Sequence, residues 1–389
     1  MKIAILQSGD LENLALGGID QYIKNIIRNR GNNDVVVYGT CVHGKYEIGK
    51  KYEIKKGDLE YSFFPISDDS VKPLTKGYLI NEPRFINTIC ECDIIYAQRM
   101  ELTIPFLFCK KARKKLVQVI HGSSYYSTLH MGAVKSRVYL LAERLSIAIA
   151  KKTYVVLMRD EFGVPYYKRK YKRFSSRIEY TKIPVNTQIF KHSDKKQCRS
   201  ELNLPMDKFL IMYGGRVENN PKRVFLFPEI LKCLNEKYNV YHLIVVGEGG
   251  DLHDLKELLA KECTPESYTI VGYLEDRRSF AKYICSSDVN LNISEFEGTC
   301  TSSLEAVACG CPVVSTDVGD IRLFVDKGEN GLIIPNSQNR RKLIQLSVEA
   351  ISDVNEDKVV MTNEYMKYEC SSAINELFLQ FHKIITEIE

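Results

Sequence analysis

The sequence lacks any apolar run long enough to cross a membrane, and it lacks a recognisable export signal. The chain has 389 residues, and a membrane-spanning helix needs ~20 consecutive apolar residues. Its first apolar run, "KIAIL" (2–6), ends at Gln7, which is too soon for the apolar region of a signal peptide. We therefore expect a cytoplasmic protein, or one that binds peripherally at the inner face of the cell membrane.

Two common nucleotide-binding motifs are also missing. The P-loop pattern G-x4-G-K-[ST] does not occur. A dinucleotide-binding G-x-G-x-x-G turn should open the first βαβ unit, but the first turn here, "QSGDLENLALGGID" (7–20), is long and unlike it. The later turn "VVGEGGD" (245–251) has different glycine spacing. The sequence thus argues against a P-loop nucleotidase and against a nicotinamide dehydrogenase.

Cysteine is plentiful but is not arranged like a metal site. The 12 cysteines are scattered, and the closest pairs, Cys90/Cys92 and Cys309/Cys311, are separated by one residue. Zinc sites usually have two or more residues between paired cysteines. Because no export signal is present, we expect reduced thiols. The cysteine spacing gives no reason to expect a metal, and we expect no cofactor.

The net charge of +5 is mild, but the basic residues are unevenly placed. They concentrate in "KKARKK" (110–115) and in "YYKRKYKRFSSR" (166–177), and the second stretch also holds aromatic residues and no acid. One interpretation is an ordinary solvated surface. The other is an anionic partner, either a lipid headgroup surface or a phosphorylated substrate. The aromatic residues favour a membrane interface, and we expect no nucleic acid because no binding module is recognisable.

Short apolar runs alternate with helical patterns along the first half of the chain. The runs are rich in Val, Ile and Tyr and nearly continuous, which is typical of parallel strands covered by helices on both faces. The stretch 46–65 is less regular and fits a hairpin or an extra strand pair. The expected strands are "KIAIL" (2–6), "DVVVYG" (34–39), "DIIYA" (93–97), "KLVQVIHG" (115–122) and "TYVVLM" (153–158).

The same rhythm begins again after a polar stretch near 190–200. The new runs are "FLIMYGG" (209–215), "HLIVVGEGG" (242–250), "YTIVGYL" (268–274), "VNLNIS" (289–294) and "PVVSTD" (312–317). We predict an α/β protein of two doubly wound Rossmann-like domains, 1–188 and 189–373, facing a central cleft. The last helix, about 374–389, is amphipathic, and the first domain is one candidate to receive it.

Two acids stand close together in "SEFEGTCTSSLEAVACGCPVV" (294–314). Ser302 and Glu305 fit a capping box at a helix start, which gives Glu305 a purely structural explanation. Glu297 has none, and it lies on a strand-to-helix loop, where catalytic groups tend to sit. The predicted helix start also offers free amides from Thr301 onward, which form an anion site.

These acids and amides together suggest a nucleotide sugar. Carboxylates repel a phosphate, so we expect the acids to bind neutral sugar hydroxyls while the amides bind phosphate. Cations for a diphosphate appear in "YGGRVENNPKR" (213–223), where Gly215 lets the backbone approach a ligand closely. Arg216 follows, and Lys222 or Arg223 begins the next segment. Arginine gives phosphate a bidentate fork and lysine a point charge.

The motifs as an ordered set resemble the retaining glycosyltransferases of family 4, which have the GT-B fold. "SEFEGTCTSSLEAVACGCPVVSTDVGD" is similar to that family's E-x7-E segment, with Glu297 and Glu305 as the two acids. The other matching segments follow in family order, closely after 205 and loosely before 180. They are "LGGIDQYIKNI" (16–26), "VNTQIF" (185–190), "YGGRVENNPKR" (213–223), "VVGEGGD" (245–251) and "IVGYLED" (270–276).

The resemblance implies roles for individual residues. Arg216 and Lys222 would hold the donor diphosphate, Glu305 would bind the ribose hydroxyls, and Glu297 would lie at the donor sugar. The amides of Thr301 and Ser302 would contact phosphate. In the same interpretation, four more residues contribute: Gly272 and Tyr273 pass beside the base, Gly18 brings the first helix's amides to the diphosphate, and His121 faces the transferred sugar. An ordinary histidine at a strand end is the alternative for His121.

The implied activity is a metal-independent, retaining hexosyl transfer from a UDP-sugar to a glycan or lipid-linked acceptor, in surface polysaccharide or glycoconjugate synthesis. No D-x-D pair occurs, in agreement with metal independence. Thr299-Cys300 replace the family's usual Phe-Gly, which leaves the donor sugar open. The arginine-to-lysine gap is one residue longer than usual, so Lys222 and Arg223 can exchange roles. A non-catalytic partner subunit of the same fold and a sugar-nucleotide epimerase remain alternatives.

Overall fold

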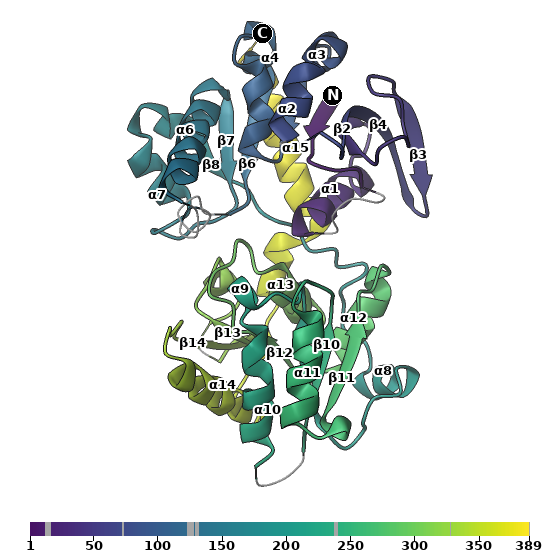
Figure 1. Cartoon of the computed structure of the whole chain (residues 1–389), viewed down its shortest axis with the longest axis vertical. Coiled ribbons are helices and arrows are strands. Elements are labelled where there is room, and N and C mark those ends of the chain that lie inside the picture. The colour runs from purple at the N-terminus through teal and green to yellow at the C-terminus, as the bar shows by residue number, and fades with distance from the viewer. Residues whose placement is uncertain are drawn as a thin grey trace. The chain divides into compact units, whose positions relative to one another are not determined.

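The chain divides into two compact units, each built on one mainly parallel sheet (Figure 1). Unit 1 comprises Met1–Pro184 with Cys370–Glu389, and unit 2 comprises Val185–Glu369. The computed structural model describes residues 1–11, 17–71, 74–122, 128, 132–236, 240–326 and 328–388. The sequence motif at 16–26 therefore begins one residue before the described range 17–71.

The sheet of unit 1 has the strand order β3-β4-β2-β1-β5-β6-β7-β8. The irregular stretch near 46–65 forms the antiparallel hairpin β3–β4, and the other neighbours pair in parallel. The strands are β1 (Lys2–Leu6), β2 (Asp34–Cys41), β3 (Tyr52–Lys56), β4 (Leu59–Asp68), β5 (Ile94–Ala97), β6 (Leu116–Ile120), β7 (Lys152–Val155) and β8 (Ile178–Tyr180).

Helices cover both faces of this sheet, which confirms the predicted architecture. Side chains alternate along β1, so Ile3 and Ile5 join one buried cluster while Ala4 and Leu6 join another. The helical segments of unit 1 are α1 (Gly18–Arg28), α2 (Leu74–Ile80), α3 (Glu82–Cys90), η1 (Met100–Phe106), α4 (Lys110–Lys115), α6 (Ala133–Ile149), α7 (Val164–Lys170), η2 (Lys172–Arg177) and α15 (Cys370–Thr386).

The last helix of the chain, α15, packs into the core of unit 1. Its buried residues Ile374, Leu377 and Phe381 belong to the same cluster as Ile5 of β1. The Phe381 ring meets Tyr96 of β5 edge-on, with ring centroids 5.1 Å apart. The N-terminal strand and the C-terminal helix are therefore parts of one core.

Unit 2 is a parallel sheet of order β11-β10-β9-β12-β13-β14. Along β9, Leu210 and Met212 pack toward one layer of helices, while Ile211 and Tyr213 pack toward the other. Its strands are β9 (Phe209–Gly214), β10 (Tyr241–Val246), β11 (Tyr268–Gly272), β12 (Val289–Asn292), β13 (Val313–Thr316) and β14 (Gly331–Ile334). Its α-helices are α8 (Lys195–Glu201), α9 (Asn219–Lys222), α10 (Phe227–Leu234), α11 (Leu252–Glu262), α12 (Arg277–Ser286), α13 (Thr301–Ala308) and α14 (Arg340–Asn355). Its described residues also form the 3-10 segments η3 (Val224–Leu226), η4 (Pro265–Ser267), η5 (Ile321–Leu323) and η6 (Glu364–Tyr368).

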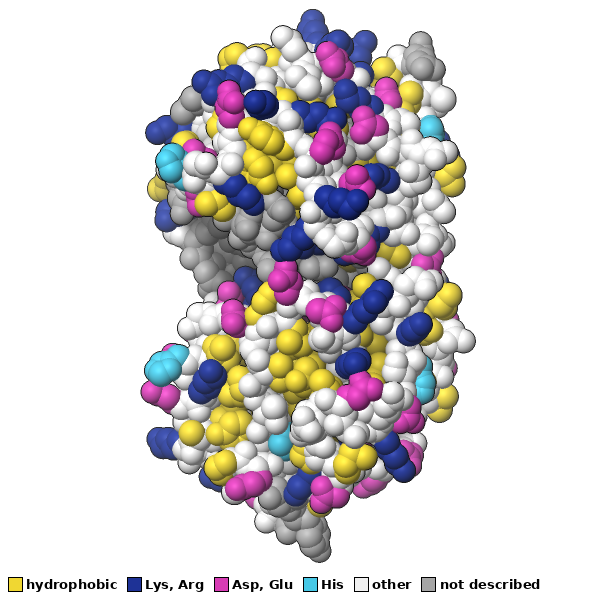
Figure 2. All heavy atoms as spheres, turned by 90° about the vertical axis from the view of Figure 1, so that its right-hand side faces the viewer, with side chains coloured by type: hydrophobic (Ala, Val, Ile, Leu, Met, Phe, Trp, Pro, Cys, Tyr) yellow, Lys and Arg dark blue, Asp and Glu magenta, His cyan; other side chains and the backbone are white. Residues whose placement is uncertain are grey.

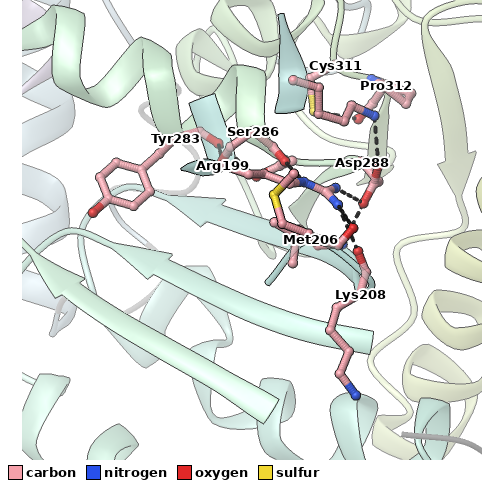
Figure 3. A network of polar contacts seen from close by, with 11 residues as sticks. Arg199, Met206, Lys208, Tyr283, Ser286, Asp288, Cys311 and Pro312 are labelled. Atoms are coloured by element: carbon pink, nitrogen blue, oxygen red, sulfur yellow. Dashed lines mark hydrogen bonds and ion pairs between the residues drawn. The ribbon is translucent and has the colours of Figure 1, made fainter. Parts of the chain in front are cut away.

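A buried arginine fastens α8 to this sheet (Figure 3). The Arg199 guanidinium contacts Asp288 at 2.6 Å and donates to the Ser286 carbonyl at 2.8 Å. The second carboxylate oxygen of Asp288 accepts from Lys195 at 2.7 Å. Because both charged groups are paired and hydrogen-bonded, the desolvation cost of burying them is offset, and the start of unit 2 is held on the β12 side of its core.

Two further properties concern the chain as a whole. Over the ranges that the structure describes, no helix is both long and apolar enough to span a bilayer. The cysteines are free thiols.

Candidate functional site

The predicted donor-site residues of unit 2 gather at one edge of its sheet. Strands β9 and β12 are neighbours, and the carboxyl ends of parallel strands meet at the same edge. Arg216 follows β9, whereas Glu297 follows β12 and precedes α13. Arg216 and Glu297 therefore lie on loops at the same end of the sheet, and Glu305 follows in the helix α13 that begins there.

Three glycine turns at this edge pack backbone against backbone. A side chain at Gly247 would place its Cβ 1.8 Å from the Gly215 carbonyl oxygen, and one at Gly249 would come 2.2 Å from the Val217 carbonyl oxygen. The Gly247 amide donates to the Gly272 carbonyl at 2.8 Å. The loops after β9, β10 and β11 thus form one surface, which only glycine permits.

Lys222 and Glu297 are in direct contact. The Lys222 ammonium lies 2.5 Å from Glu297 Oε1, and both side chains are largely buried. Ser294 Oγ lies 2.7 Å from the same carboxylate oxygen, and the Glu295 amide donates to the Pro221 carbonyl at 2.8 Å. The α9 turn is therefore fastened to the loop after β12, and this fixes the cation beside the acid.

Arg223 points elsewhere. Its guanidinium donates to Asn336 Oδ1 at 2.8 Å and lies 3.4 Å from the Ile293 carbonyl. Of the two residues that the sequence left interchangeable, Lys222 is the one that reaches Glu297. Arg223 instead braces the β12 loop against the segment after β14.

Arg216 presents an exposed cation. Its guanidinium lies 3.1 Å from Glu218 Oε2, and its side chain is 63% exposed. The Tyr213 hydroxyl donates to the Arg216 carbonyl at 2.5 Å, which fixes the backbone at this position. An exposed surface pair of this kind is weak, so Arg216 can exchange Glu218 for an anionic ligand at little cost.

The prediction of a capping box formed by Ser302 and Glu305 is wrong. Helix α13 begins at Thr301 with Cys300 as its N-cap, and no side chain caps it. Glu305 is therefore one turn inside the helix, too far along to reach back to a cap amide.

The prediction that the Thr301 amide is free to bind an anion is also wrong, because this amide donates to the Thr299 carbonyl at 2.8 Å. The first intrahelical bond runs from the Leu304 amide to the Cys300 carbonyl. Among the described residues, the Ser302 and Ser303 amides have no hydrogen-bond acceptor. These two are the first-turn donors that remain for an anion.

Glu305 has a partner that the sequence did not reveal. Arg277, the first residue of α12, donates from Nη2 to Glu305 Oε1 at 2.6 Å. Its guanidinium also lies over the rings of Phe280 and Phe190, 4.4 and 5.0 Å from their centroids. Burial raises the pKa of Glu305, and the Arg277 charge opposes that rise. In the sequence, the segment "LEDRRSF" (274–280) indicates only that a helix begins here, because Asp276 caps α12. It does not indicate that Arg277 contacts Glu305.

The base-side residues lie on the connection that also carries Arg277. Gly272 has a φ of +83°, a left-handed conformation that favours glycine. Tyr273 follows it with an exposed side chain. The predicted Gly272-Tyr273 segment and the Glu305 partner therefore leave the sheet together, between β11 and α12.

The remaining predicted residues belong to unit 1. Gly18 is the first residue of α1, where the Asp20 carboxylate accepts from the Gly17 amide at 2.9 Å. His121 follows β6, and its Nε2 lies 2.9 Å from Gln98 Oε1. Burial, with a smaller contribution from the Arg99 charge, lowers the pKa of His121 to about 3. The imidazole is thus neutral at physiological pH.

Part of unit 2 is similar in sequence to known glycosyltransferases. Residues 208–353 match the family model described as "Glycosyl transferases group 1". A putative teichuronic acid biosynthesis glycosyltransferase, TuaC of Bacillus subtilis, is 26% identical over 159 residues, which is 40% of this chain and 38% of TuaC. The O-antigen biosynthesis glycosyltransferase WbnH of Escherichia coli is 24% identical over 245 residues, 63% of this chain and 61% of WbnH. The matched region spans less than two thirds of either relative.

Solved structures extend the likeness to the whole chain. Sucrose-phosphate synthase from Thermosynechococcus elongatus superposes with a TM-score of 0.78 at 16% identity, covering 99% of both chains. HepE of Anabaena, in complex with UDP-glucose, gives 0.72 at 15% identity, covering 98% of this chain and 100% of HepE. The chain therefore has the GT-B fold, and residues 208–353 of its second unit match the group 1 glycosyltransferases.

Proposed function

We propose that the protein is a glycosyltransferase that moves a hexose from a UDP-sugar to a hydroxyl of a glycan or lipid-linked acceptor. The observation that carries this proposal is the charged set at the edge of unit 2, where Lys222 contacts Glu297 and Arg277 contacts Glu305 within the region that matches the family model. TuaC and WbnH are named for polysaccharide synthesis, and HepE was solved with UDP-glucose. These names support a role in surface polysaccharide or glycoconjugate synthesis.

In this proposal the diphosphate binds between Arg216, Lys222 and the Ser302 and Ser303 amides. A diphosphate oxygen competes with Glu297 for the Lys222 ammonium, and the released carboxylate can then bind a sugar hydroxyl. Glu305, held by Arg277, accepts from the ribose hydroxyls. Cations and helix amides neutralise the negative charge of the diphosphate, while both carboxylates bind neutral hydroxyl groups.

The transferred bond is the one between the anomeric carbon and the diphosphate oxygen. As it breaks, negative charge grows on the leaving phosphate, and preorganised cations and amides stabilise that charge. A double displacement would need a carboxylate on the far face of the anomeric carbon, and no residue has been assigned that role. We therefore favour same-face attack assisted by the leaving phosphate, with retention of configuration and without metal.

Two other functions compete with this proposal. A non-catalytic subunit of the same fold has no need for the charged set, so the presence of Arg216, Lys222, Glu297 and Glu305 counts against it. A sugar-nucleotide epimerase binds the same donor, but it converts the free nucleotide sugar with no acceptor. The first alternative predicts no product, and the second predicts an isomerised nucleotide sugar, so both are distinguishable from transfer.

The test begins with UDP-sugars and UDP as additives in thermal unfolding. A ligand at 100 times its Kd contributes about 2.7 kcal/mol, which is visible as a melting shift. UDP release is then compared between the native protein, Glu297→Gln and the control Glu295→Gln. Glu295 lies on the same loop as Glu297, and its carboxylate accepts a hydrogen bond from Gln338 Nε2. We expect release to fall at least about 100-fold in Glu297→Gln only. No UDP release above background in any of the three proteins supports the partner-subunit function, and isomerisation without acceptor supports the epimerase. Equal release well above background would contradict the role assigned to Glu297.

A further inference from the structure

Helix α6 of unit 1 carries an apolar stripe that faces away from the protein core. Val134, Val138 and Leu141 are 75%, 62% and 57% exposed. Their spacing of four and three residues aligns them on one side of the helix. Isolated exposed apolar residues are common, but three in line on one helix form a continuous apolar surface.

The opposite side of α6 is firmly packed, so the direction of the stripe is fixed. Glu143 is buried on that side and accepts hydrogen bonds from Lys170 at 2.7 Å and from the Tyr171 hydroxyl. Ser146 and Ile147 are buried beside it. On a helical projection these positions lie roughly 120–180° from the stripe. Helix α6 cannot turn the stripe inward without breaking the Glu143 contacts.

Cations flank the stripe and continue onto the neighbouring segments. Arg137 and Arg144 lie along one side of it and Lys135 along the other, and all three are exposed. Helix α7 and η2, joined to α6 through Glu143, add the exposed residues Lys168, Arg169, Lys170, Lys172, Arg173 and Arg177. The stretches 132–151 and 162–178 contain one acid, the buried Glu143.

The β3–β4 side of unit 1 does not share this charge pattern. Figure 2 shows the molecule from the right-hand side of Figure 1, where β3 and β4 lie and which is opposite α6 and α7. Basic and acidic side chains are interspersed on that face, as on an ordinary soluble surface. The α6–η2 surface, defined as α6, α7 and η2, instead exposes cations around the apolar stripe, and Arg169 contacts Asp160 at its border.

Aromatic rings are placed among these cations. The Phe174 ring lies 5.9 and 5.6 Å from the guanidinium carbons of Arg173 and Arg177. The Lys170 ammonium lies 5.4 Å from the Tyr166 ring centre. Aromatic rings beside basic groups suit the headgroup depth of a bilayer, where rings contact apolar chains and cations contact phosphates.

We propose that the α6–η2 surface docks on an anionic lipid bilayer. An exposed apolar stripe flanked by cations is the arrangement of helices that lie in the membrane interface, and anionic headgroups supply the complementary charge. Nucleic acid would use the cations but gain nothing from the stripe. A second copy of the chain would bring a second cationic surface against the first. The proposal does not depend on the proposed function.

The experiment uses the full chain and vesicles of equal parts phosphatidylcholine and phosphatidylglycerol, with pure phosphatidylcholine as reference. We expect co-flotation with the anionic vesicles and about a fivefold loss of affinity for each cation removed in Arg137→Gln and Arg144→Gln. Val138→Glu with Leu141→Glu should abolish binding. The matched controls are Leu379→Glu, an exposed apolar position on α15, and Lys111→Gln with Lys114→Gln on α4; both should bind like the native protein.

A direct probe of insertion is available because the chain contains no tryptophan. Val138→Trp places a single tryptophan on the stripe, and Leu379→Trp places one on the control face. The first should shift its emission to the blue and be quenched by brominated lipid, while the second should not. The proposal would be overturned if the native protein did not bind anionic vesicles. It would also be overturned if the α4 variants lost as much binding as the α6 variants. A stripe variant that changes only the oligomeric state would overturn it as well.

Discussion

At the residue scale, Arg277 is a testable addition to the proposed donor site. Glu305 Oε1 is engaged by the arginine, so the other carboxylate oxygen remains to accept from a ribose hydroxyl. Without Arg277 the buried carboxylate loses the charge that opposes its raised pKa and becomes a poorer acceptor. We expect Arg277→Gln to weaken UDP binding about tenfold, and to raise KM for the donor more than it lowers kcat.

Two comparisons separate positioning from simple loss of stability. 2′-Deoxy-UDP lacks one hydroxyl that Glu305 would bind, so its affinity should change much less in Arg277→Gln than that of UDP. Arg277→Lys should recover part of the affinity, while the neighbouring Arg278→Gln, at an exposed position, should leave it unchanged. Equal losses for both nucleotides would assign Arg277 a structural role.

Asp20 gives unit 1 a pH dependence opposite to that of an ordinary salt-bridged acid. Burial raises its pKa from 3.8 to about 6, so the folded carboxyl binds its proton more tightly than the unfolded one. The stability from this group is complete below pH 3.8 and is lost as the pH rises through about 6. The difference is on the order of 2–3 kcal/mol. We expect Asp20→Asn to stabilise the protein at pH 7.5 but not at pH 4.5.

Urea unfolding at the two pH values measures this effect. Asparagine can still accept from the Gly17 amide, which Asp20 does now, so the helix start is preserved. The exposed Asp69→Asn on the same unit serves as the control for removing one surface carboxylate. A profile of Asp20→Asn that matches the native one would show that Asp20 is already ionised without cost.

Residue roles were predictable from sequence only where spacing is short or a motif is ordered. Glu297 and Lys222 are far apart in the chain, but both belong to known positions of an ordered motif set, and the structure places them 2.5 Å apart. Arg277 belongs to no such motif, and its contact with Glu305 depends on how α12 packs against α13. The expected cap failed because α13 starts at Thr301, one residue before the predicted serine.

At the element scale, the glycine turns determine how closely the strand ends approach. We expect Gly247→Ala to destabilise unit 2 by about 2–4 kcal/mol, since its Cβ would overlap the Gly215 carbonyl and its φ of +148° disfavours a side chain. Gly250→Ala is the matched control, because no atom lies within 4 Å of its Cβ. Chemical denaturation of both variants checks this, and equal stabilities would show that the two loops can separate freely.

Elements were predicted more reliably in the second half of the chain than in the first. The runs at 209–215, 242–250 and 268–274 became β9, β10 and β11, because each is an apolar run that ends in a glycine turn. The β3–β4 hairpin was left as one of two options, since its alternating charged residues fit an edge strand without specifying a neighbour. Helix α4 was seen only as a basic run, because its apolar face is a single buried Ala112.

At the scale of the whole molecule, the two-unit architecture follows from two separate series of strands and helices. Each series builds a mainly parallel sheet with a buried cluster on either face. What sequence periodicity could not determine is where the last helix goes. An amphipathic helix needs only an apolar surface, and both sheets offer one. The structure gives α15 to unit 1, where Phe381 and Phe378 fill the cluster beside β1 and β5.

This division predicts that the two units can be destabilised independently. Phe381 is fully buried in unit 1 and Phe227 is nearly so in unit 2, and each truncation to alanine should cost about 3–5 kcal/mol in its own unit. Differential scanning calorimetry should show Phe381→Ala lowering one transition and Phe227→Ala the other. UDP, which the proposed site binds through unit 2, should raise the transition that Phe381→Ala leaves in place. A single transition that both variants shift equally would mean that the units unfold as one cooperative body, so that the packing of α15 stabilises the donor site as well.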